Sequence, residues 1–288
     1  MKDEGPIRTI RSALDWSRTI ARGAPAAGAL DAHRLLAHVL EIPVHEVHLS
    51  PDREVSPRQA ECFREYWRRR LRGHPLQYLV GETEFFSLRF EVTPGVFIPR
   101  PETERLVESV ISRSGGGGVW VDAGTGAGVI AVSLAVHLSG SLVYAVDRST
   151  RAAALARRNA SLHGVGDRVR VVCGDLLRPF RRTAWADGVV SNPPYVATRE
   201  KHTLPVEVRE HEPEEALYAG PDGLAVIRRL VREVPGVLKP GGLLAVEIGE
   251  TQSTEVRSLL GRDRGWDGAT VEMDLADRPR VAVARWSG

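Results

Sequence analysis

Residues 119–128 read VWVDAGTGAG, and this stretch decides the fold. Val119–Asp122 predicts a buried strand that runs into Gly124-Thr125-Gly126-Ala127-Gly128, and an apolar helix is expected directly after the glycines. Glycine at such a turn lets backbone N–H groups approach a ligand without a Cβ in the way, and the start of the following helix favours a negative group. A dinucleotide site more often has the spacing GxGxxG, whereas GxGxG stands here. The stretch therefore predicts a strand–loop–helix unit that binds another kind of ligand.

Strand-like and helix-like segments alternate from Val119 onward, which is typical of a parallel sheet covered on both faces. The expected strands are 119–122, 142–146, 169–173, 188–191, 243–248 and 281–286. The expected helices are 129–138, 150–163, 224–238 and 254–260. Residues 271–273 and 281–285 are expected to form a terminal hairpin rather than another βα unit.

The chain before this region predicts helices without convincing strands, so residues 1–74 are expected to form a small N-terminal helical domain. One helical face carries Ala32, Leu35, Leu36, Val39 and Leu40, with Asp31 as the expected start signal of that helix. A second helix is expected over 57–73, with Arg64, Arg68, Arg69 and Arg72 turned away from its aromatic residues. Charged helix faces usually only face water, but a docking site is the other interpretation of these arginines.

Residues 75–98 differ in character, because Phe85, Phe86, Leu88, Phe90 and Val92 give strand-like alternation over part of the segment. The alternation predicts a hairpin linker between the helical domain and a larger domain over 99–288. The larger domain opens with Pro99-Arg100-Pro101-Glu102-Thr103-Glu104. A proline at the first helical position with acids in the first turn predicts a helix start there.

The most specific chemical signal is Asn192-Pro193-Pro194-Tyr195, directly after the expected strand 188–191. The asparagine side-chain oxygen and the carbonyl of Pro193 are two acceptors, and two prolines fix the backbone φ angles that hold them in place. Such a pair suits the two protons of a planar NH2 group, as in an amide or an exocyclic amine. If that nitrogen is methylated, the acceptors stabilise the positive charge that develops on it, and Tyr195 can stack on the flat group.

Two further acids follow expected strands. Asp147 stands at the end of the second strand, where a carboxylate can accept hydrogen bonds from both hydroxyls of a ribose. The glycine loop after Asp122 resembles motif I of the class I S-adenosylmethionine-dependent methyltransferases, which implies S-adenosylmethionine as the cofactor. By that resemblance, Asp175 stands where adenine is contacted, with Leu176 as an apolar neighbour, and Asn192 also borders the cofactor.

Bulk properties restrict the other classes of function. The chain has 39 Lys and Arg against 37 Asp and Glu, which gives a net charge of +2. The electrostatic potential of the whole chain therefore does not favour a nucleic-acid binder. Cys62 and Cys173 are the two cysteines, and their spacing supports neither a disulfide framework nor a metal site. No window approaches the roughly 20 apolar residues of a membrane helix, and Met1–Glu4 carries acids rather than a targeting signal. A cytoplasmic protein is expected.

With these residues in view, nearly the whole chain resembles the bacterial release factor glutamine methyltransferase family, also called the HemK family. Beyond Asn192–Tyr195, the stretches that carry the resemblance are Pro75–Tyr78 with Gly81, Phe97–Glu104, Glu212-Pro213 with Ala216-Leu217, Gly223-Leu224, Gly241-Gly242, Glu247–Gly249 with Gln252, and Arg278–Arg280. Position 127 departs from the family, because it is alanine where serine or threonine is common. Leu176 stands where some relatives have an aromatic residue, which implies weaker stacking on adenine.

The resemblance implies a seven-stranded doubly wound class I methyltransferase sheet that ends in an antiparallel strand. It also implies that an N-terminal domain, which precedes the sheet in the chain, holds a peptide chain release factor. It implies transfer of a methyl group to N5 of the glutamine in the Gly-Gly-Gln loop of that factor. Asn192 and Pro193 would hold the amide, with Pro194 and Tyr195 completing the catalytic motif, while Gly124–Gly128, Asp147 and Leu176 would line the cofactor. Phe97, Pro99, Arg100 and Glu102 are the expected substrate contacts, and the enzyme is expected to be a monomer without a metal.

Four alternatives differ from this interpretation. A sister family methylates a glutamine of a ribosomal protein, but its linker typically reads differently from Pro101–Glu104. A DNA or RNA amino methyltransferase would need a large basic groove or a base-recognition domain, which the near-neutral charge disfavours. A non-catalytic scaffold has no need of Asn192–Tyr195. Another glutamine-bearing protein as the substrate stays open.

Overall fold

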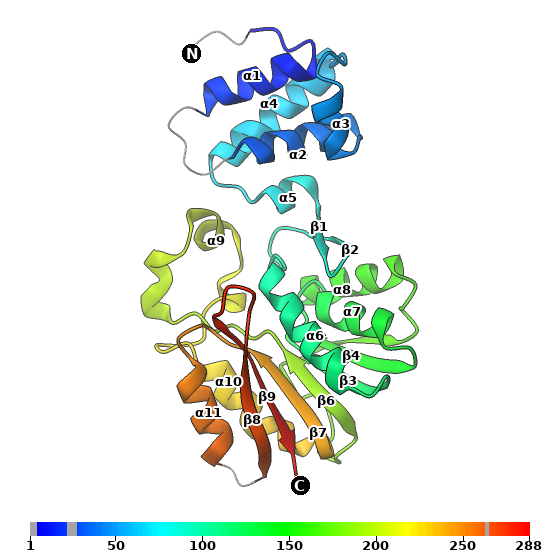
Figure 1. Cartoon of the computed structure of the whole chain (residues 1–288), viewed down its shortest axis with the longest axis vertical. Helices are drawn as coiled ribbons and strands as arrows, with labels where there is room; N and C mark the ends of the chain where they lie inside the picture. Colours follow the sequence, from blue (N-terminus) through cyan, green and yellow to red (C-terminus); the bar gives the residue numbers. More distant parts are fainter. Residues whose placement is uncertain (1–4, 22–27, 263–264) are drawn as a thin grey trace. The chain divides into compact units, whose positions relative to one another are not determined.

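The computed structural model describes residues 5–21, 28–262 and 265–288, so Met1–Glu4 lie outside the described residues. The chain divides into two compact units. The helical unit contains the chain up to Gly81 together with Pro205–His211, and the sheet unit contains Glu82–Leu204 and Glu212–Gly288 (Figure 1). Each unit has its own core and is described by itself.

The helical unit is built from α1 (Ile10–Ile20), α2 (Ala29–Leu40), α3 (Val44–Leu49), α4 (Pro57–Leu71), α5 (Leu76–Val80) and α9 (Val206–His211). Capping boxes at Thr9 and Ser56 start α1 and α4, because each side chain accepts a backbone N–H that the first turn leaves unpaired. The expected apolar face of α2 is buried against Phe63 and Trp67 of α4. Asp31, the expected start signal, lies in the first turn of α2, which begins at Ala29, and its carboxylate accepts the Gly28 N–H at 3.4 Å.

Arg70 is the buried charge of the helical unit and lies on α4. Its Nε donates to Asp31 of α2 at 2.8 Å, and its Nη1 pairs with Glu207 of α9 at 2.8 Å. The rings of His74 and His211 lie 4.4 Å apart next to this pair. Arg70 therefore connects α9, which comes much later in the chain, to the helical unit. The periodicity of α4 did not predict this role for Arg70.

The hairpin expected within 75–98 is shorter than that segment. It consists of β1 (Glu82–Phe85) and β2 (Leu88–Glu91), which pair antiparallel, while residues 76–80 form α5. Leu76 and Leu79 are buried in the core of the helical unit, which favours helix over strand there. Gly81 ends α5 at a φ of +84°, a left-handed conformation that suits glycine.

The sheet unit contains one seven-stranded sheet in the order β5-β4-β3-β6-β7-β9-β8. Its strands are β3 (Gly118–Ala123), β4 (Ser141–Asp147), β5 (Val169–Cys173), β6 (Ala186–Ser191), β7 (Leu238–Glu247), β8 (Trp266–Met273) and β9 (Pro279–Trp286). β3 to β7 are parallel, and β9 is antiparallel to both β7 and β8. The predicted fold class, a doubly wound α/β sheet preceded in the chain by a small helical domain, is confirmed.

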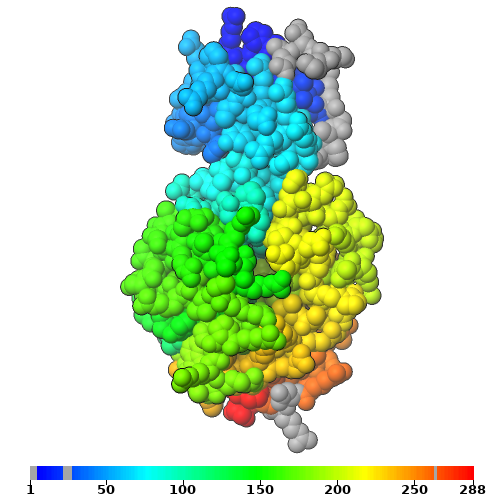
Figure 2. All heavy atoms as spheres, turned by 180° about the vertical axis from the view of Figure 1, so that it is seen from behind, coloured from blue at the N-terminus to red at the C-terminus, as the bar shows by residue number. Residues whose placement is uncertain are grey.

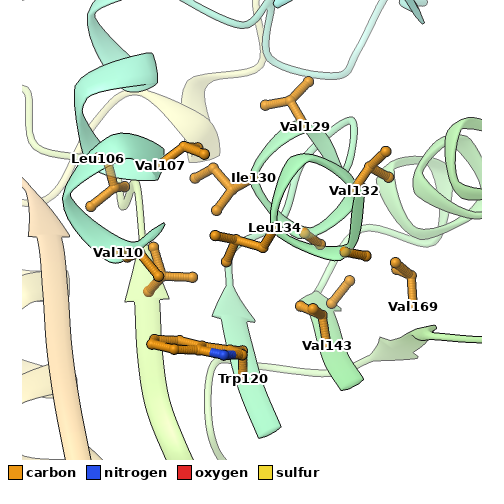
Figure 3. Packing of buried hydrophobic residues seen from close by; sticks show 14 of the residues in the cluster. Leu106, Val107, Val110, Trp120, Val129, Ile130, Val132, Leu134, Val143 and Val169 are labelled. Carbon is orange, nitrogen blue, oxygen red and sulfur yellow. The ribbon is translucent and has the colours of Figure 1, made fainter. Parts of the chain in front are cut away.

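Two separate cores cover the faces of this sheet, because successive strand residues point to opposite sides. Trp120 of β3 packs with α6 (Glu104–Arg113), α7 (Val129–His137) and α8 (Thr150–Leu162), whereas Val121 packs with α10 (Ala225–Glu233) and α11 (Ser253–Arg262). Figure 3 shows side chains of α6 and α7, among them Val110 and Leu134, converging above Trp120.

One predicted helix boundary was wrong. The helix expected over 224–238 ends as α10 at Glu233, since Pro235 lacks an N–H and its ring is incompatible with a continuing helix. The short 3-10 turn η4 (Val234–Gly236) follows, and β7 already begins at Leu238. Further 3-10 turns are η1 (Pro101–Thr103), η2 (Thr198–Thr203) and η3 (Glu214–Ala216).

Candidate active site

The carboxyl ends of the parallel strands meet at one edge of the sheet, where ligands of such folds bind. The strand register pairs Ala123 with Val146, Asp147 with Cys173, and Ser191 with Val246. The loops that follow β3, β4, β5, β6 and β7 therefore emerge side by side. The glycine loop, Asp147, Asp175 and Asn192–Tyr195, predicted from four separate stretches, all stand at this edge.

Backbone hydrogen bonds fix the conformation of the glycine loop after β3. The N–H groups of Gly124 and Thr125 donate to the carbonyl of Val146 at 2.8 and 2.9 Å, and Gly128 donates to Thr125 at 2.8 Å. Gly124, Gly126 and Gly128 have positive φ values, while Ala127 is buried. A Cβ added at Gly124 or Gly126 would meet no atom within 4 Å, so open space lies beside the loop. This cradle fits a ligand that approaches the backbone closely.

Asp122 stabilises the loop from beneath. Its Oδ2 accepts the hydroxyl of Thr125 at 2.5 Å and the N–H of Ala131 at 3.1 Å, whereas its buried Oδ1 has no partner. Burial raises the pKa of Asp122 to about 7, although the two hydrogen bonds oppose the shift. The carboxyl therefore links the loop to the first turn of α7 and has no access to solvent.

Asp147 connects the end of β4 to the same loop. Its Oδ2 accepts the N–H of Gly126 at 2.9 Å, and its Oδ1 accepts the N–H of Ser149 at 2.9 Å. Each carboxylate oxygen keeps a second lone pair for a ligand hydroxyl. Burial raises the pKa of Asp147, with the two backbone N–H groups opposing that shift. This geometry fits the ribose role that the sequence predicted.

Asp175 follows β5, but its carboxylate is engaged in ion pairs. Arg229 of α10 donates to Oδ1 at 2.7 Å, and Arg178 lies 3.3 Å from Oδ2. The hydrogen bond from Arg229 lowers the pKa of Asp175. Leu176 has a φ of +49° and packs against the core on the α10 side of the sheet. The expected adenine contact of Asp175 stays a prediction, and its side chain already has a structural partner.

Asn192–Tyr195 directly follows β6 and is attached to three neighbouring segments. Ser191 Oγ donates to the carbonyl of Ala123 at 2.5 Å, which fixes this turn beside the glycine loop. The Asn192 side chain donates through Nδ2 to Thr103 Oγ1 at 2.9 Å. Gln252 donates through Nε2 to the carbonyl of Tyr195 at 3.0 Å. The motif is therefore rigid on both sides of its two prolines.

Glu247, the last residue of β7, lies beneath this turn and is buried. The hydroxyls of Thr103 and Tyr195 hydrogen-bond with its carboxyl, but its Oε2 has no partner. Burial raises the pKa of Tyr195, and the nearby Glu247 raises it further. Sequence reasoning assigned no role to Thr103, Glu247 or Gln252. Their signal was present, because all three stand in the stretches that carried the family resemblance.

The segment of expected substrate contacts, residues 97–102, is anchored from within the sheet unit. Arg100 forms an ion pair with buried Glu212, and the same carboxylate accepts the N–H of Ile98 at 3.2 Å. The guanidinium of Arg100 lies 5.0 Å above the ring of Phe97, a cation–π distance. Pro99 is half-buried, and Glu102 lies close enough to raise the pKa of Glu247. Contact of these four residues with a substrate stays a prediction.

The surface of the sheet unit is hollowed at one place. Figure 2 shows a hollow in the surface between the green residues that include α8 and the yellow residues that follow β6.

Within the described residues, no group of histidine, cysteine and acidic side chains is arranged to hold a metal ion. Among the helices of the same ranges, none is both long and apolar enough to cross a membrane.

Two family models match the chain. The PrmC N-terminal domain matches residues 12–81, and the methyltransferase small domain matches residues 88–210. A release factor glutamine methyltransferase from Moorella thermoacetica is 40% identical over 96% of this chain and 98% of its own length. Another from Nitratidesulfovibrio vulgaris is 38% identical over 97% of both chains.

The solved structures support the fold. A methyltransferase from Pyrococcus furiosus superposes with a TM-score of 0.53 at 19% identity, covering 70% of this chain and 90% of that one. At such low identity the likeness concerns the sheet and its helices.

Proposed function

The chain belongs to the release factor glutamine methyltransferase family and is a methyltransferase, and we propose that it transfers a methyl group from S-adenosylmethionine to the side-chain nitrogen N5 of the Gly-Gly-Gln glutamine of peptide chain release factors. One observation carries this proposal. Asn192-Pro193 and the glycine loop follow adjacent strands and are connected by the hydrogen bond from Ser191 Oγ to Ala123 (2.5 Å). An amide-binding turn thus stands directly beside a cradle for the methyl donor.

The cofactor, when bound, supplies a methyl group that a positively charged sulfur makes electrophilic. Gly124 and Gly126 border the open space that would receive it. Asp147 offers its remaining lone pairs to the ribose hydroxyls. Leu176 borders the adenine in this proposal. Because its pKa is about 7, the carboxyl of Asp122 supports the loop without adding a full negative charge to the site at neutral pH.

Asn192 Oδ1 and the carbonyl of Pro193 accept the two protons of the substrate amide. Because the lone pair of an amide nitrogen is delocalised, orientation and loss of water contribute more to the rate than a strong base does. As the nitrogen–carbon bond forms and the carbon–sulfur bond breaks, positive charge develops on the nitrogen. The two acceptors stabilise that charge more in the transition state than in the ground state. The excess proton then leaves the nitrogen for solvent.

Tyr195 packs on the flat amide in this mechanism. Burial and Glu247 both raise the pKa of its phenol, so the hydroxyl keeps its proton and does not act as a base near neutral pH. Phe97, Pro99, Arg100 and Glu102 form the wall that meets the glutamine-bearing loop, with Arg100 held in place by Glu212. The N-terminal helical domain expected over 1–74, followed by the linker expected over 75–98, is proposed to hold the body of the release factor.

The test is mass spectrometry of purified release factor after incubation with the enzyme and S-adenosylmethionine. The expected product carries one methyl group on the Gly-Gly-Gln glutamine. Parallel incubations with ribosomal proteins and with duplex DNA or RNA cover the other substrates that an amide- or amine-binding turn could accept. Methylation of one of those substrates alone would overturn the proposed substrate.

A further inference from the structure

The side-chain amide of Asn192 can stand in two orientations that exchange its oxygen and its nitrogen. Only one of them suits the proposed reaction, because the substrate amide presents two N–H donors and needs acceptors. With Oδ1 toward the substrate, Asn192 accepts a hydrogen bond. With Nδ2 toward the substrate, two NH2 groups would face each other and the developing positive charge would meet a donor. Something in the protein must therefore select the orientation.

Thr103 is placed to make this selection. It is buried at the end of η1, and its Oγ1 lies 2.9 Å from Asn192 Nδ2. A hydroxyl has a single proton to donate. The Thr103 hydroxyl lowers the pKa of the buried Glu247 carboxyl, as expected if it directs this proton to that carboxyl. Toward Asn192 the hydroxyl then offers only lone pairs, so the atom of Asn192 that faces it must be the donor Nδ2.

Glu247 completes the arrangement from a different element. The register that pairs Ser191 with Val246 places Glu247 next to Asn192 at the edge of the sheet. Its carboxyl also accepts the hydroxyl of Tyr195, so one buried acid interacts with Tyr195 directly and with Asn192 through Thr103. A buried carboxyl with an unpartnered oxygen costs stability.

We infer that Thr103 and Glu247 are positioning residues that hold the Asn192 side chain with Oδ1 toward the substrate nitrogen, an inference that rests on the proposed amide methylation. Neither residue touches the reacting atoms in this arrangement. Glu247 fixes the direction of the Thr103 hydroxyl, and that hydroxyl fixes the asparagine. Three side chains therefore act in sequence: Glu247 of β7, Thr103 of η1, and Asn192 in the turn after β6.

The charge of Glu247 makes this role dependent on pH. Burial raises its pKa to about 7; the Thr103 and Tyr195 hydroxyls and Arg280 oppose the shift, and Glu102 adds to it. A neutral Glu247 would itself carry a proton and could reverse the Thr103 hydroxyl. The orientation is therefore secure only while the carboxyl is ionised.

The kinetic test compares Thr103→Val with Thr103→Ser. Valine has nearly the shape of threonine without the hydroxyl, so kcat should fall about tenfold or more, while the KM for release factor and the affinity for S-adenosylmethionine stay within about twofold. Serine keeps the hydroxyl and should restore most of kcat. In an Asn192→Ala background, Thr103→Val should cause no further loss. An equal loss in both backgrounds, or an unchanged kcat in Thr103→Val, would overturn the inference.

A second measurement needs no substrate. The chain has two asparagines, Asn159 and Asn192, so isotope labelling of asparagine gives two side-chain NH2 signals in an NMR spectrum. Asn159 Nδ2 donates to the carbonyls of Ala127 (2.8 Å) and Glu91 (3.1 Å), so its signal is an internal reference. In Thr103→Val the Asn192 signal should move or exchange faster with water while the Asn159 signal stays. Unmoved signals would reject the positioning role, even if the wild-type enzyme methylated a different substrate.

Discussion

At the scale of single residues, Asp147 and Asp175 form a matched pair of acids that follow neighbouring strands. Asp147 accepts only backbone N–H groups, whereas the Asp175 carboxylate is paired with Arg229. Asp147→Ala should weaken S-adenosylmethionine binding by about 1–3 kcal/mol, because a charged acceptor of two hydroxyls is lost. Asp175→Ala should change that affinity several-fold less. Isothermal titration calorimetry of the two variants measures the difference, and equal losses would contradict the ribose role.

The raised pKa of Asp122 predicts how the free energy of unfolding depends on pH. Its pKa is raised to about 7 in the folded chain, from 3.8. The folded state therefore binds this proton more tightly than the unfolded state, and the contribution of Asp122 to the free energy of unfolding falls as pH rises from about 4 to about 7. Between pH 5 and pH 8 the wild type should lose roughly 2–4 kcal/mol through this group.

The Asp122→Asn variant tests the sign of this effect. An amide oxygen in place of Oδ2 keeps the acceptor for Thr125 and Ala131, and it removes the titrating proton. Urea unfolding of both proteins at pH 5 and pH 8 gives the comparison. The variant should show the smaller loss of stability with rising pH. A wild type that gains stability relative to the variant over this range would show that the pKa of Asp122 is not raised.

The site residues differ in how far the sequence could predict them. Asn192–Tyr195 and the glycine loop are contiguous motifs, each next to a strand that its own apolar residues predict, so their place at the sheet edge followed from the sequence. Thr103 and Glu247 come from separate segments, and only the register of β6 against β7 brings Glu247 beside Asn192. Arg100 was expected to meet the substrate, but its ion pair with Glu212 depends on a turn that no local pattern predicts.

At the scale of elements, the contact between α7 and α8 depends on a glycine. Gly128 begins α7 at a φ of +84°, and a Cβ there would lie 2.9 Å from the Ala156 Cβ of α8. Gly124 has a similar φ of +82° but open space around it. Gly128→Ala should therefore lower the free energy of unfolding by about 2–4 kcal/mol, through both backbone strain and the clash between helices.

Gly124→Ala is the control, because it carries the backbone strain alone and should cost only about 1–2 kcal/mol. Urea unfolding at one pH measures both variants. Similar losses for the two would mean that α7 and α8 can separate to admit a methyl group.

The elements that the sequence predicted well are those with a periodic apolar pattern and a marked end. β5 was expected over 169–173 and has these bounds, and α8 differs from its prediction by one residue. The helix expected to reach residue 238 was too long, because its apolar pattern continues through η4 into the first residue of β7. Short elements such as α5 and α9 have too few residues for a period, and only tertiary contacts stabilise them.

At the scale of the whole molecule, the chain passes from the catalytic turn into the helical unit and back. Residues 205–211 belong to the helical unit, where Glu207 pairs with Arg70, and residues 212–220 return to form backbone hydrogen bonds with Val196 and Thr198. A contiguous division at residue 74 could not include this excursion, because the pairing joins residues far apart in the sequence. The segment that follows Asn192–Tyr195 thus connects the proposed substrate-binding turn to the helical unit along the chain.

This arrangement predicts that the size of the substrate decides the rate. If the helical unit holds the body of the release factor, a short peptide containing Gly-Gly-Gln lacks the remote contacts whose binding energy orients the amide. Its kcat/KM should be at least about 100-fold lower than that of the intact factor, which corresponds to about 2.7 kcal/mol. Steady-state methylation of both substrates measures this ratio, with Asn192→Ala as the inactive control for each. Equal values would mean that the sheet unit alone recognises the glutamine and that the helical unit contributes to stability rather than to recognition.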